Sequence, residues 1–150
     1  MQPIQEREYI NEAGKRVVMD MFTYQVPVFT NLAVGASLTN QIIIQADADF
    51  EWIEAVYEFD LAAAAYLYNT RPMPNMTVLI VDGSSGRQLM NNAVPVVNIF
   101  GRPEMPYVMP ITKTFKANAT IQFTATNFDA AVTTGNLRLS LIGVKHFIMG

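Results

Sequence analysis

Two segments in the second half of the chain alternate apolar and polar residues with a period of two, a pattern that β-strands produce. The alternating apolar residues are Ile121, Phe123 and Ala125 in the first segment, and Leu137, Leu139 and Leu141 in the second. A two-residue period places one set of side chains on a buried sheet face and the other set in solvent. We therefore expect strands over Thr120–Thr126 and Asn136–Phe147, each with one face against a core.

Further β-rich segments bring the expected number of strands to about eight. They are Met21–Phe29, Thr39–Ala46, Phe50–Phe59, Met76–Val81 and Val96–Phe100, with Leu61–Tyr68 as a strand that its alanines would also allow to be a short helix. Turn signals separate them irregularly, which favours an all-β fold, a β-sandwich of jelly-roll or Greek-key type. We expect one such domain over residues 20–150, preceded by an extended N-terminal arm over residues 1–19.

Two segments carry more specific expectations. Phe50–Phe59 has apolar residues on both parities, which predicts a strand covered on both faces. Pro95–Pro110 contains four of the eight prolines, which predicts that the strand at Val96–Phe100 is followed by an extended crossing loop. Pro27 predicts an edge or a bend near the end of the first strand.

The composition argues against chemistry and favours a protein that works through its surface. The 150 residues include no cysteine, one histidine and 15% charged residues, and their net charge is −3. An acidic chain lacks the basic footprint that binding to nucleic acid needs. The acidic amino terminus does not resemble a signal peptide, and no apolar stretch approaches the ~20 residues that span a bilayer. We expect no enzyme activity, no cofactor, no metal, and no nucleic-acid or membrane partner.

Charge is unevenly distributed along the chain. Residues 17–60 contain seven acidic residues and no lysine or arginine, whereas residues 61–150 contain seven basic residues and three acidic ones. Three interpretations stay open: scatter over a solvated surface, complementary faces that orient copies of the chain, or pairing of the two signs within one subunit.

Four groups of residues are candidates for sites, and each has a simpler structural interpretation. His146 would need a distant acid and a serine to form a triad, and otherwise ends a strand. Asp47, Asp49 and Glu51 share strand parity and could hold a cation or, with Glu54, form a carboxylate pair, although solvated carboxylates are commoner. Gly83–Arg87 lacks the lysine of a phosphate loop and predicts a hairpin turn. The aromatic residues that could stack on a sugar, or instead fill the core, are Trp52, Tyr57, Tyr66, Tyr68 and Tyr107.

The carboxyl half resembles a known class of proteins in the order of its short motifs. These motifs are Arg87–Asn91, Pro95, Phe100-Gly101-Arg102-Pro103, Met109-Pro110-Ile111, Lys116–Thr120, Phe123–Asn127 and the final Leu139–Phe147. In this order they resemble small virion structural proteins of tailed bacteriophages, among them the jelly-roll capsid decoration, or cement, proteins. The resemblance covers half to two-thirds of the chain and leaves out its amino-terminal third.

The resemblance implies a protein made in the host cytoplasm that binds the major capsid protein shell as a dimer or trimer, on the virion surface. The alternatives are a tail, neck or fibre-associated protein, and, in another class, a carbohydrate-binding β-sandwich. We expect the arm up to Met19 and the loop Pro103–Pro110 to make the main contacts. The residues expected to take part are Ile4, Tyr9, Ile10, Phe22, Tyr24, Arg102, Glu104, Met105 and Tyr107.

Overall fold

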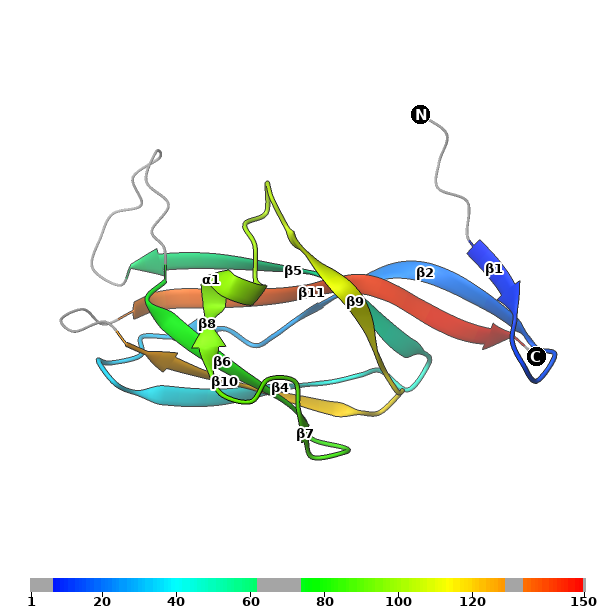
Figure 1. The fold of residues 1–150 in the computed structure, drawn as a ribbon, viewed down its shortest axis with the longest axis horizontal. Coiled ribbons are helices and arrows are strands. Elements are labelled where there is room, and N and C mark those ends of the chain that lie inside the picture. Colours follow the sequence, from blue (N-terminus) through cyan, green and yellow to red (C-terminus); the bar gives the residue numbers. More distant parts are fainter. Residues whose placement is uncertain (1–6, 62–73, 129–133, 150) are drawn as a thin grey trace.

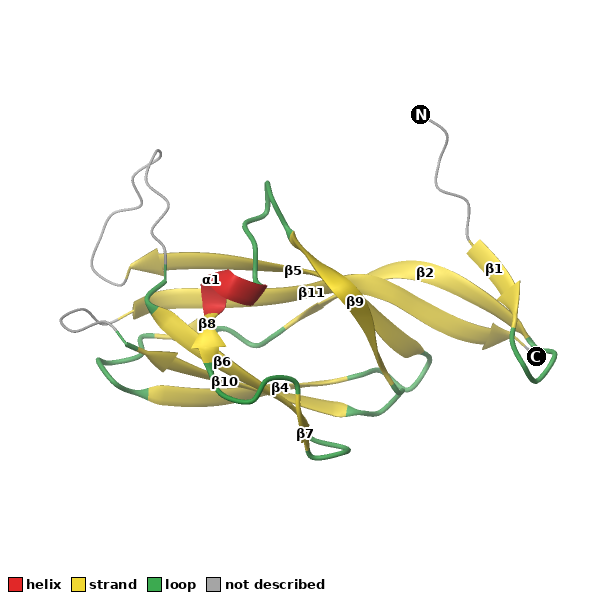
Figure 2. Cartoon of the chain, viewed as in Figure 1, coloured by secondary structure: helices red, strands yellow, loops and turns green. Residues whose placement is uncertain are grey.

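The protein folds into two antiparallel sheets packed face to face (Figures 1 and 2). The structure is a computed structural model that describes residues 7–61, 74–128 and 134–149. Sheet A contains β1 (Arg7–Ile10), β2 (Arg16–Gln25), β3 (Phe29–Thr30), β5 (Asp49–Leu61), β9 (Tyr107–Phe115) and β11 (Thr134–Met149). Sheet B contains β4 (Ser37–Ile43), β6 (Met76–Asp82), β7 (Arg87–Gln88), β8 (Val94–Pro95) and β10 (Thr120–Asn127). A single helical turn, α1 (Val96–Ile99), follows β8.

The strand pairs are nested along the chain, and this nesting identifies a jelly roll. The outermost pair is β2 with β11, followed inward by β4 with β10 and β5 with β9. The innermost pairs join β6 to β7 and β8. One long antiparallel ribbon wound into a sandwich gives this order, with successive pairs assigned alternately to the two sheets. The predicted all-β sandwich of jelly-roll type is confirmed.

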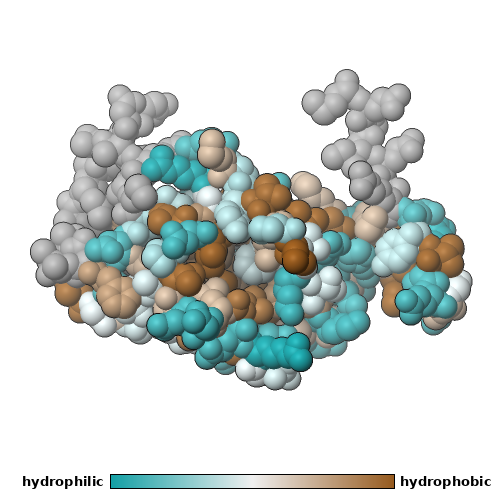
Figure 3. Space-filling model, in the orientation of Figure 1, coloured by the Kyte–Doolittle hydropathy of each residue, from teal (hydrophilic) through white to brown (hydrophobic). Residues whose placement is uncertain are grey.

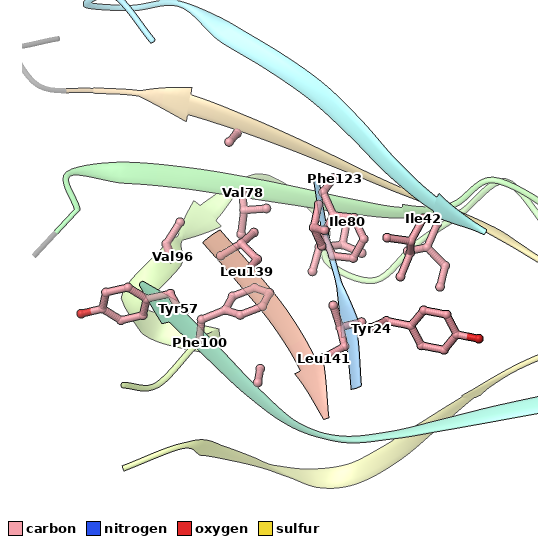
Figure 4. Close-up of a cluster of buried hydrophobic side chains, with 14 of the residues drawn as sticks. Tyr24, Ile42, Tyr57, Val78, Ile80, Val96, Phe100, Phe123, Leu139 and Leu141 are labelled. Carbon is pink, nitrogen blue, oxygen red and sulfur yellow. The ribbon is translucent and has the colours of Figure 1, made fainter. Parts of the chain in front are cut away.

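The core lies between the sheets and consists of aliphatic and aromatic side chains (Figure 4). Leu139 and Leu141 project from β11 of sheet A toward Ile80 and Phe123 of sheet B. All four side chains are fully buried, as the alternating pattern in the sequence predicts. Burying a side chain of this size contributes roughly 1.5–3 kcal/mol, so these alternating segments supply much of the stability.

A β-bulge in β5 corrects the prediction that this strand is covered on both faces. Trp52 pairs with Gly143 and Glu54 with Ile142, so Ile53 is an extra residue in the ladder. The bulge shifts the parity, and the side chains that point into the core are Phe50 and Trp52 before it and Ala55 and Tyr57 after it. The buried residues of both parities thus belong to one core face, interrupted by one inserted residue, whereas Val56 is half-buried outside the core.

The segment from Pro95 to Phe115 also differs from its prediction. Val96–Ile99 is a helical turn rather than a strand, since Pro95 at its start has a fixed φ and the Phe100 N–H donates to the Val96 carbonyl at 2.9 Å. Part of the expected loop belongs to β9, which tolerates Pro110 because it is an edge strand of sheet A. Pro27 lies between β2 and β3, at the expected bend.

The amino-terminal segment joins sheet A within its described part. β1 pairs with β2 in a hairpin, and β2 pairs with β11 from its first residue, Arg16, onward. The expected boundary between arm and domain at residue 19 therefore falls inside β2, where Val17 and Val18 are buried. Residues 1–6, and residues 62–68 of the segment expected to be a strand or a helix, lie outside the described residues.

Candidate interaction surface

Sheet A extends beyond the sandwich as a narrow ribbon at one end of the molecule (right in Figure 1). The pairing of β5 with β11 ends at His146, so residues 147–149 of β11 pair with β2 alone. We call the β1–β2 hairpin together with residues 147–149 the terminal ribbon. β1 forms the edge of sheet A, and in the described part of the chain its only strand partner is β2. Among the described residues, no strand pairs with the other side of β1.

The terminal ribbon exposes several large apolar side chains. Ile10 is 67% exposed, Ile148 60% and Met149 49%. Figure 3 shows this end of the molecule with apolar atoms lying among hydrophilic ones. Scattered apolar residues are normal on protein surfaces, but three at one narrow tip, beside an open strand edge, mark a candidate contact site.

A hydrogen-bonded row crosses sheet A next to the ribbon. The Tyr9 hydroxyl lies 3.2 Å from Nδ1 of His146, and Nε2 of His146 lies 2.9 Å from a Glu51 oxygen. The other Glu51 oxygen accepts a hydrogen bond from the Thr112 hydroxyl at 2.7 Å. Since a carboxylate only accepts, Nε2 of His146 carries a proton that it donates to Glu51, and the Tyr9 hydroxyl is the partner of Nδ1. The row thus ties the β1 edge to β11, β5 and β9.

The row predicts how stability depends on pH. The Thr112 hydrogen bond and the contacts with His146 lower the pKa of Glu51 below its ordinary value, against the opposing effect of burial. A lowered folded-state pKa contributes stability that is present above the unfolded pKa and is lost as the pH falls through the folded one. We expect Glu51→Gln to weaken this acid-dependent loss, measured by thermal unfolding between about pH 6 and about pH 3. Glu58→Gln, on the same face of β5, is the control and should keep the wild-type slope.

The same row bears on catalysis. It supplies the acid partner that a triad with His146 would need, but the group at Nδ1 is a tyrosine hydroxyl rather than a serine. The Tyr9 hydroxyl connects β1 to His146, and among the described residues no serine or threonine hydroxyl is hydrogen-bonded to His146. The arrangement links β1 to β11 and β5.

A buried cation lies where the ribbon meets the sandwich. The Lys145 side chain is 3% exposed, and its ammonium donates to Gln45 and to both Asp47 oxygens, at 3.0 and 3.2 Å. The same ammonium lies 3.8 Å from the centre of the Phe22 ring, with Tyr24 and Phe147 near 6 Å. In this cage the carboxylate and the amide thus supply three acceptors for the ammonium, and the Phe22 ring supplies a cation–π contact.

The acidic segment pairs with basic residues of the same chain. Lys145 contacts Asp47, Lys116 contacts Asp49 at 3.4 Å, and Arg138 lies 3.9 Å from Asp60. The nested topology brings β5 beside β9 and β11, so the two signs meet within one subunit. Asp47, Asp49 and Glu51 accordingly have three different partners, and the described residues contain no group of three or more side chains arranged to hold a metal.

The residues expected to make contacts are distributed over three places. Tyr9 and Ile10 lie on the terminal ribbon, and Ile4 lies outside the described residues. Phe22 and Tyr24 instead line the Lys145 cage, and the Tyr24 hydroxyl accepts the Gln45 N–H at 2.9 Å. Tyr24 is buried, so it takes no part in an outer surface. One feature of the sequence could have predicted the cage. Lys145 follows Leu139 and Leu141 at two-residue spacing, so it lies on the face of the strand that points into the core.

The remaining expected contacts lie in the turn before β9. Arg102 and Met105 close this turn through an isolated bridge, and Met105 is 77% exposed. The hydrogen bond with the buried Tyr57 raises the pKa of Arg102, and Glu104 adds to this effect. Tyr107 is half-buried and pairs with Ala55 at the start of the β5–β9 ladder. The turn is a second exposed feature, separate from the ribbon.

Two other candidate sites have structural roles. Gly83–Arg87 forms the turn between β6 and β7, closed by the Gly86 N–H donating to Asp82 at 2.7 Å, which confirms the predicted hairpin. Trp52 and Tyr57 are core residues, and Trp52 stacks on Phe115. Neither ring is available to a sugar. Tyr66 and Tyr68 lie outside the described residues.

The comparisons with known proteins yield a fold-level likeness only. No protein-family model matches the chain, and no curated protein matches it. Among solved structures, the infectious bursal disease virus VP2 subviral particle is similar over 87% of this chain and 41% of its own, with 12% identity and a TM-score of 0.33. A structure from the Gt strain of the same virus is similar over 88% of this chain and 38% of its own, with 14% identity and a TM-score of 0.28. The chain thus spans about two-fifths of these proteins, and its fold assignment rests on its own strand order. In the described part of the chain, no helix has the length and apolarity to cross a membrane.

Proposed function

We propose that the chain is a viral structural protein that decorates an assembled phage capsid and stabilises it by bridging neighbouring shell subunits. The observation that carries the proposal is the terminal ribbon, with its open β1 edge and its apolar tip. The jelly-roll strand order supports it, because this architecture is frequent among viral capsid domains. The order of motifs in the carboxyl half supports it as well.

The ribbon has the properties of an element that adds to a neighbouring sheet. An open edge offers main-chain hydrogen bonds, and the flanking apolar side chains supply the desolvated contacts that fix the partner. Ile10 and Met149 are the exposed anchors at the tip. The hydrogen bond from Tyr9 to His146 holds β1 in place, so little ordering entropy is lost when the edge pairs.

Bridging requires a second contact, and the turn around Met105 supplies it in this proposal. Met105 is a flexible apolar side chain, 77% exposed, in a turn held by Arg102 and stiffened by Pro103 and Pro106. A rigid turn and a projecting ribbon on one small domain allow contact with two neighbouring shell subunits. The proposal includes no catalytic step and no cofactor.

The test combines the chain with particles assembled from the shell protein encoded in the same genome. We expect the wild-type chain to co-sediment with these particles, and Ile10→Lys/Met149→Lys to lose at least tenfold in occupancy. Val34→Lys is the control, since Val34 is 49% exposed in the turn between β3 and β4, outside the terminal ribbon. Both variants should unfold at the wild-type denaturant midpoint. Equal occupancy of the double variant and the wild type would exclude the ribbon as the contact.

Copy number separates decoration from the alternative virion locations. A decoration protein is present at a fixed ratio to the shell subunits, whereas a tail, neck or fibre protein occurs in a few copies per particle. Quantitative mass spectrometry of purified particles measures this ratio. A few copies per particle would leave a viral structural role but exclude capsid decoration.

A further inference from the structure

The outward positions of β4, β10 and β6 in sheet B carry no charged residue, and we propose that two copies of the chain pack against each other through this face. The residues that point outward from β4, β10 and β6 define what we call the neutral face. They are Ser37, Thr39, Gln41 and Ile43 on β4, Thr120, Gln122, Thr124 and Thr126 on β10, and Thr77, Leu79 and Val81 on β6. The residues that alternate with them, such as Ile42, Ile121 and Ile80, are buried in the core.

Neutrality at these positions is unusual for a surface in contact with water. A solvated surface is roughly 25–35% charged, so about three of these eleven positions would carry a charge. The outer face of sheet A meets this expectation with Glu51, Glu54, Glu58 and Arg138. Charged residues are depleted where protein surfaces pack together, because their desolvation is costly. The charge asymmetry between the two faces thus distinguishes a packing face from a solvated one.

Four of the six hydroxyl groups of the neutral face are already paired with one another, whereas the buried Thr77 hydroxyl has no hydrogen-bond partner. The Ser37 and Thr126 oxygens lie 2.6 Å apart across the strands, and those of Thr39 and Thr124 lie 2.8 Å apart. A hydroxyl that donates to its neighbour loses less when water leaves the surface. Most of these side chains are also β-branched, so they lose little rotamer freedom on packing. The face is therefore inexpensive to bury.

A second copy of the chain is the occupant that the charges favour. Two chains of net charge −3 repel each other through most orientations, but not when two neutral faces meet. A partner with charged groups would find no counter-charge on this face. Flat sheet faces also stack on one another about 10 Å apart. A two-fold arrangement, in which each copy presents the same patch, satisfies these conditions.

The size of the face sets the expected strength of association. Same-face residues lie about 6.8 Å apart along a strand and strands about 4.8 Å apart, which gives about 33 Å² for each outward residue. The neutral face therefore offers about 360 Å² of projected area on each copy. The two copies together would cover about 720 Å² of projected area, which is the size of a weak, transient contact rather than of a stable dimer. We expect a dimer whose dissociation constant lies in the micromolar range.

The test introduces charge without changing shape. Gln41 and Gln122 lie directly opposite each other at the centre of the neutral face, and both are exposed. Gln41→Glu/Gln122→Glu should weaken dimerisation at least tenfold in sedimentation equilibrium of the full chain. The matched control, Thr23→Glu/Gln25→Glu, adds the same two charges to exposed positions of β2 and should dimerise like the wild type.

A mixing experiment tests the geometry directly. Gln41→Lys/Gln122→Lys should also weaken self-association, but an equimolar mixture of the Lys and Glu variants should form heterodimers that salt dissociates. Folded variants that fail to associate with each other would overturn the proposal, and so would a wild-type chain that stays monomeric up to millimolar concentration. A monomeric wild type whose binding to shell particles is lost in the Glu variant would assign the face to the shell instead.

Discussion

Gly143→Ala is expected to destabilise the protein by about 3 kcal/mol or more. A Cβ atom at this position would lie 1.9 Å from the carbonyl oxygen of Glu51 and 3.0 Å from the Phe50 ring. Main-chain atoms cannot move aside as a flexible side chain does, so β11 and β5 would have to separate at the bulge. Glycine at a bulge, where another strand approaches closely, has this role. Urea unfolding followed by circular dichroism measures the loss.

The control for this prediction is Ser140→Ala on the same strand. Ser140 points outward and is half-buried, so its truncation should change stability by about 0.5 kcal/mol or less. A midpoint for Gly143→Ala within experimental error of the wild type would show that the two strands accommodate a methyl group. The same comparison tests why the Gly-Val-Lys motif of the last strand begins with glycine.

Asp47→Ala is expected to cost more stability than Lys145→Met, although the two residues form one ion pair. The Lys145 side chain is 3% exposed and that of Asp47 is 50% exposed. Without Asp47 the buried ammonium keeps only Gln45 and the aromatic rings, and we expect a loss of about 2 kcal/mol. Without Lys145 the carboxylate turns to water, and methionine fills the cage, so we expect a loss of about 1 kcal/mol.

The double variant Asp47→Ala/Lys145→Met completes the test. Once the ammonium is absent, removing Asp47 should cost little further stability, so the two losses should not add. The coupling follows from denaturant unfolding of the four proteins. Equal losses for the two single variants, or additive losses in the double variant, would show that the cage does not isolate Lys145 from water.

The alternating segments were predictable because their burial is decided locally. Leu139, Leu141 and Phe123 lie on a single parity, and each strand needs only one buried face to explain them. The hairpin at Gly83–Arg87 was predictable for a similar reason, since glycine, serine and aspartate favour tight turns wherever they occur.

Other elements were not predictable because a distant strand decides them. The apolar residues of β5 changed parity at Ile53, and only the partner strand reveals that this residue is an insertion. Pro106 lies just before β9 and Pro110 lies within it. β9 tolerates proline because it is an edge strand, and which strand lies at an edge depends on the whole sheet. Val96–Ile99 had strand-like residues but follows a proline that begins a helical turn.

The candidate surfaces show the same division. Tyr9 and Ile10 were expected to be contact residues, and both side chains are exposed. Phe22 and Tyr24 were expected to be contact residues as well, yet they surround Lys145, a residue more than one hundred positions away in the chain. The neutral face combines residues from three strands that are distant in the sequence. The lack of charge on this face therefore cannot be recognised from any one segment.

The sequence by itself determined that this protein is a β-sandwich with few reactive groups, because strand periodicity and composition are properties of short segments. Only the tertiary structure decided which charges pair within the subunit, which face lacks charge and where the sheet extends beyond the core. These features depend on which strands become neighbours, and in a jelly roll the neighbours come from opposite ends of the chain.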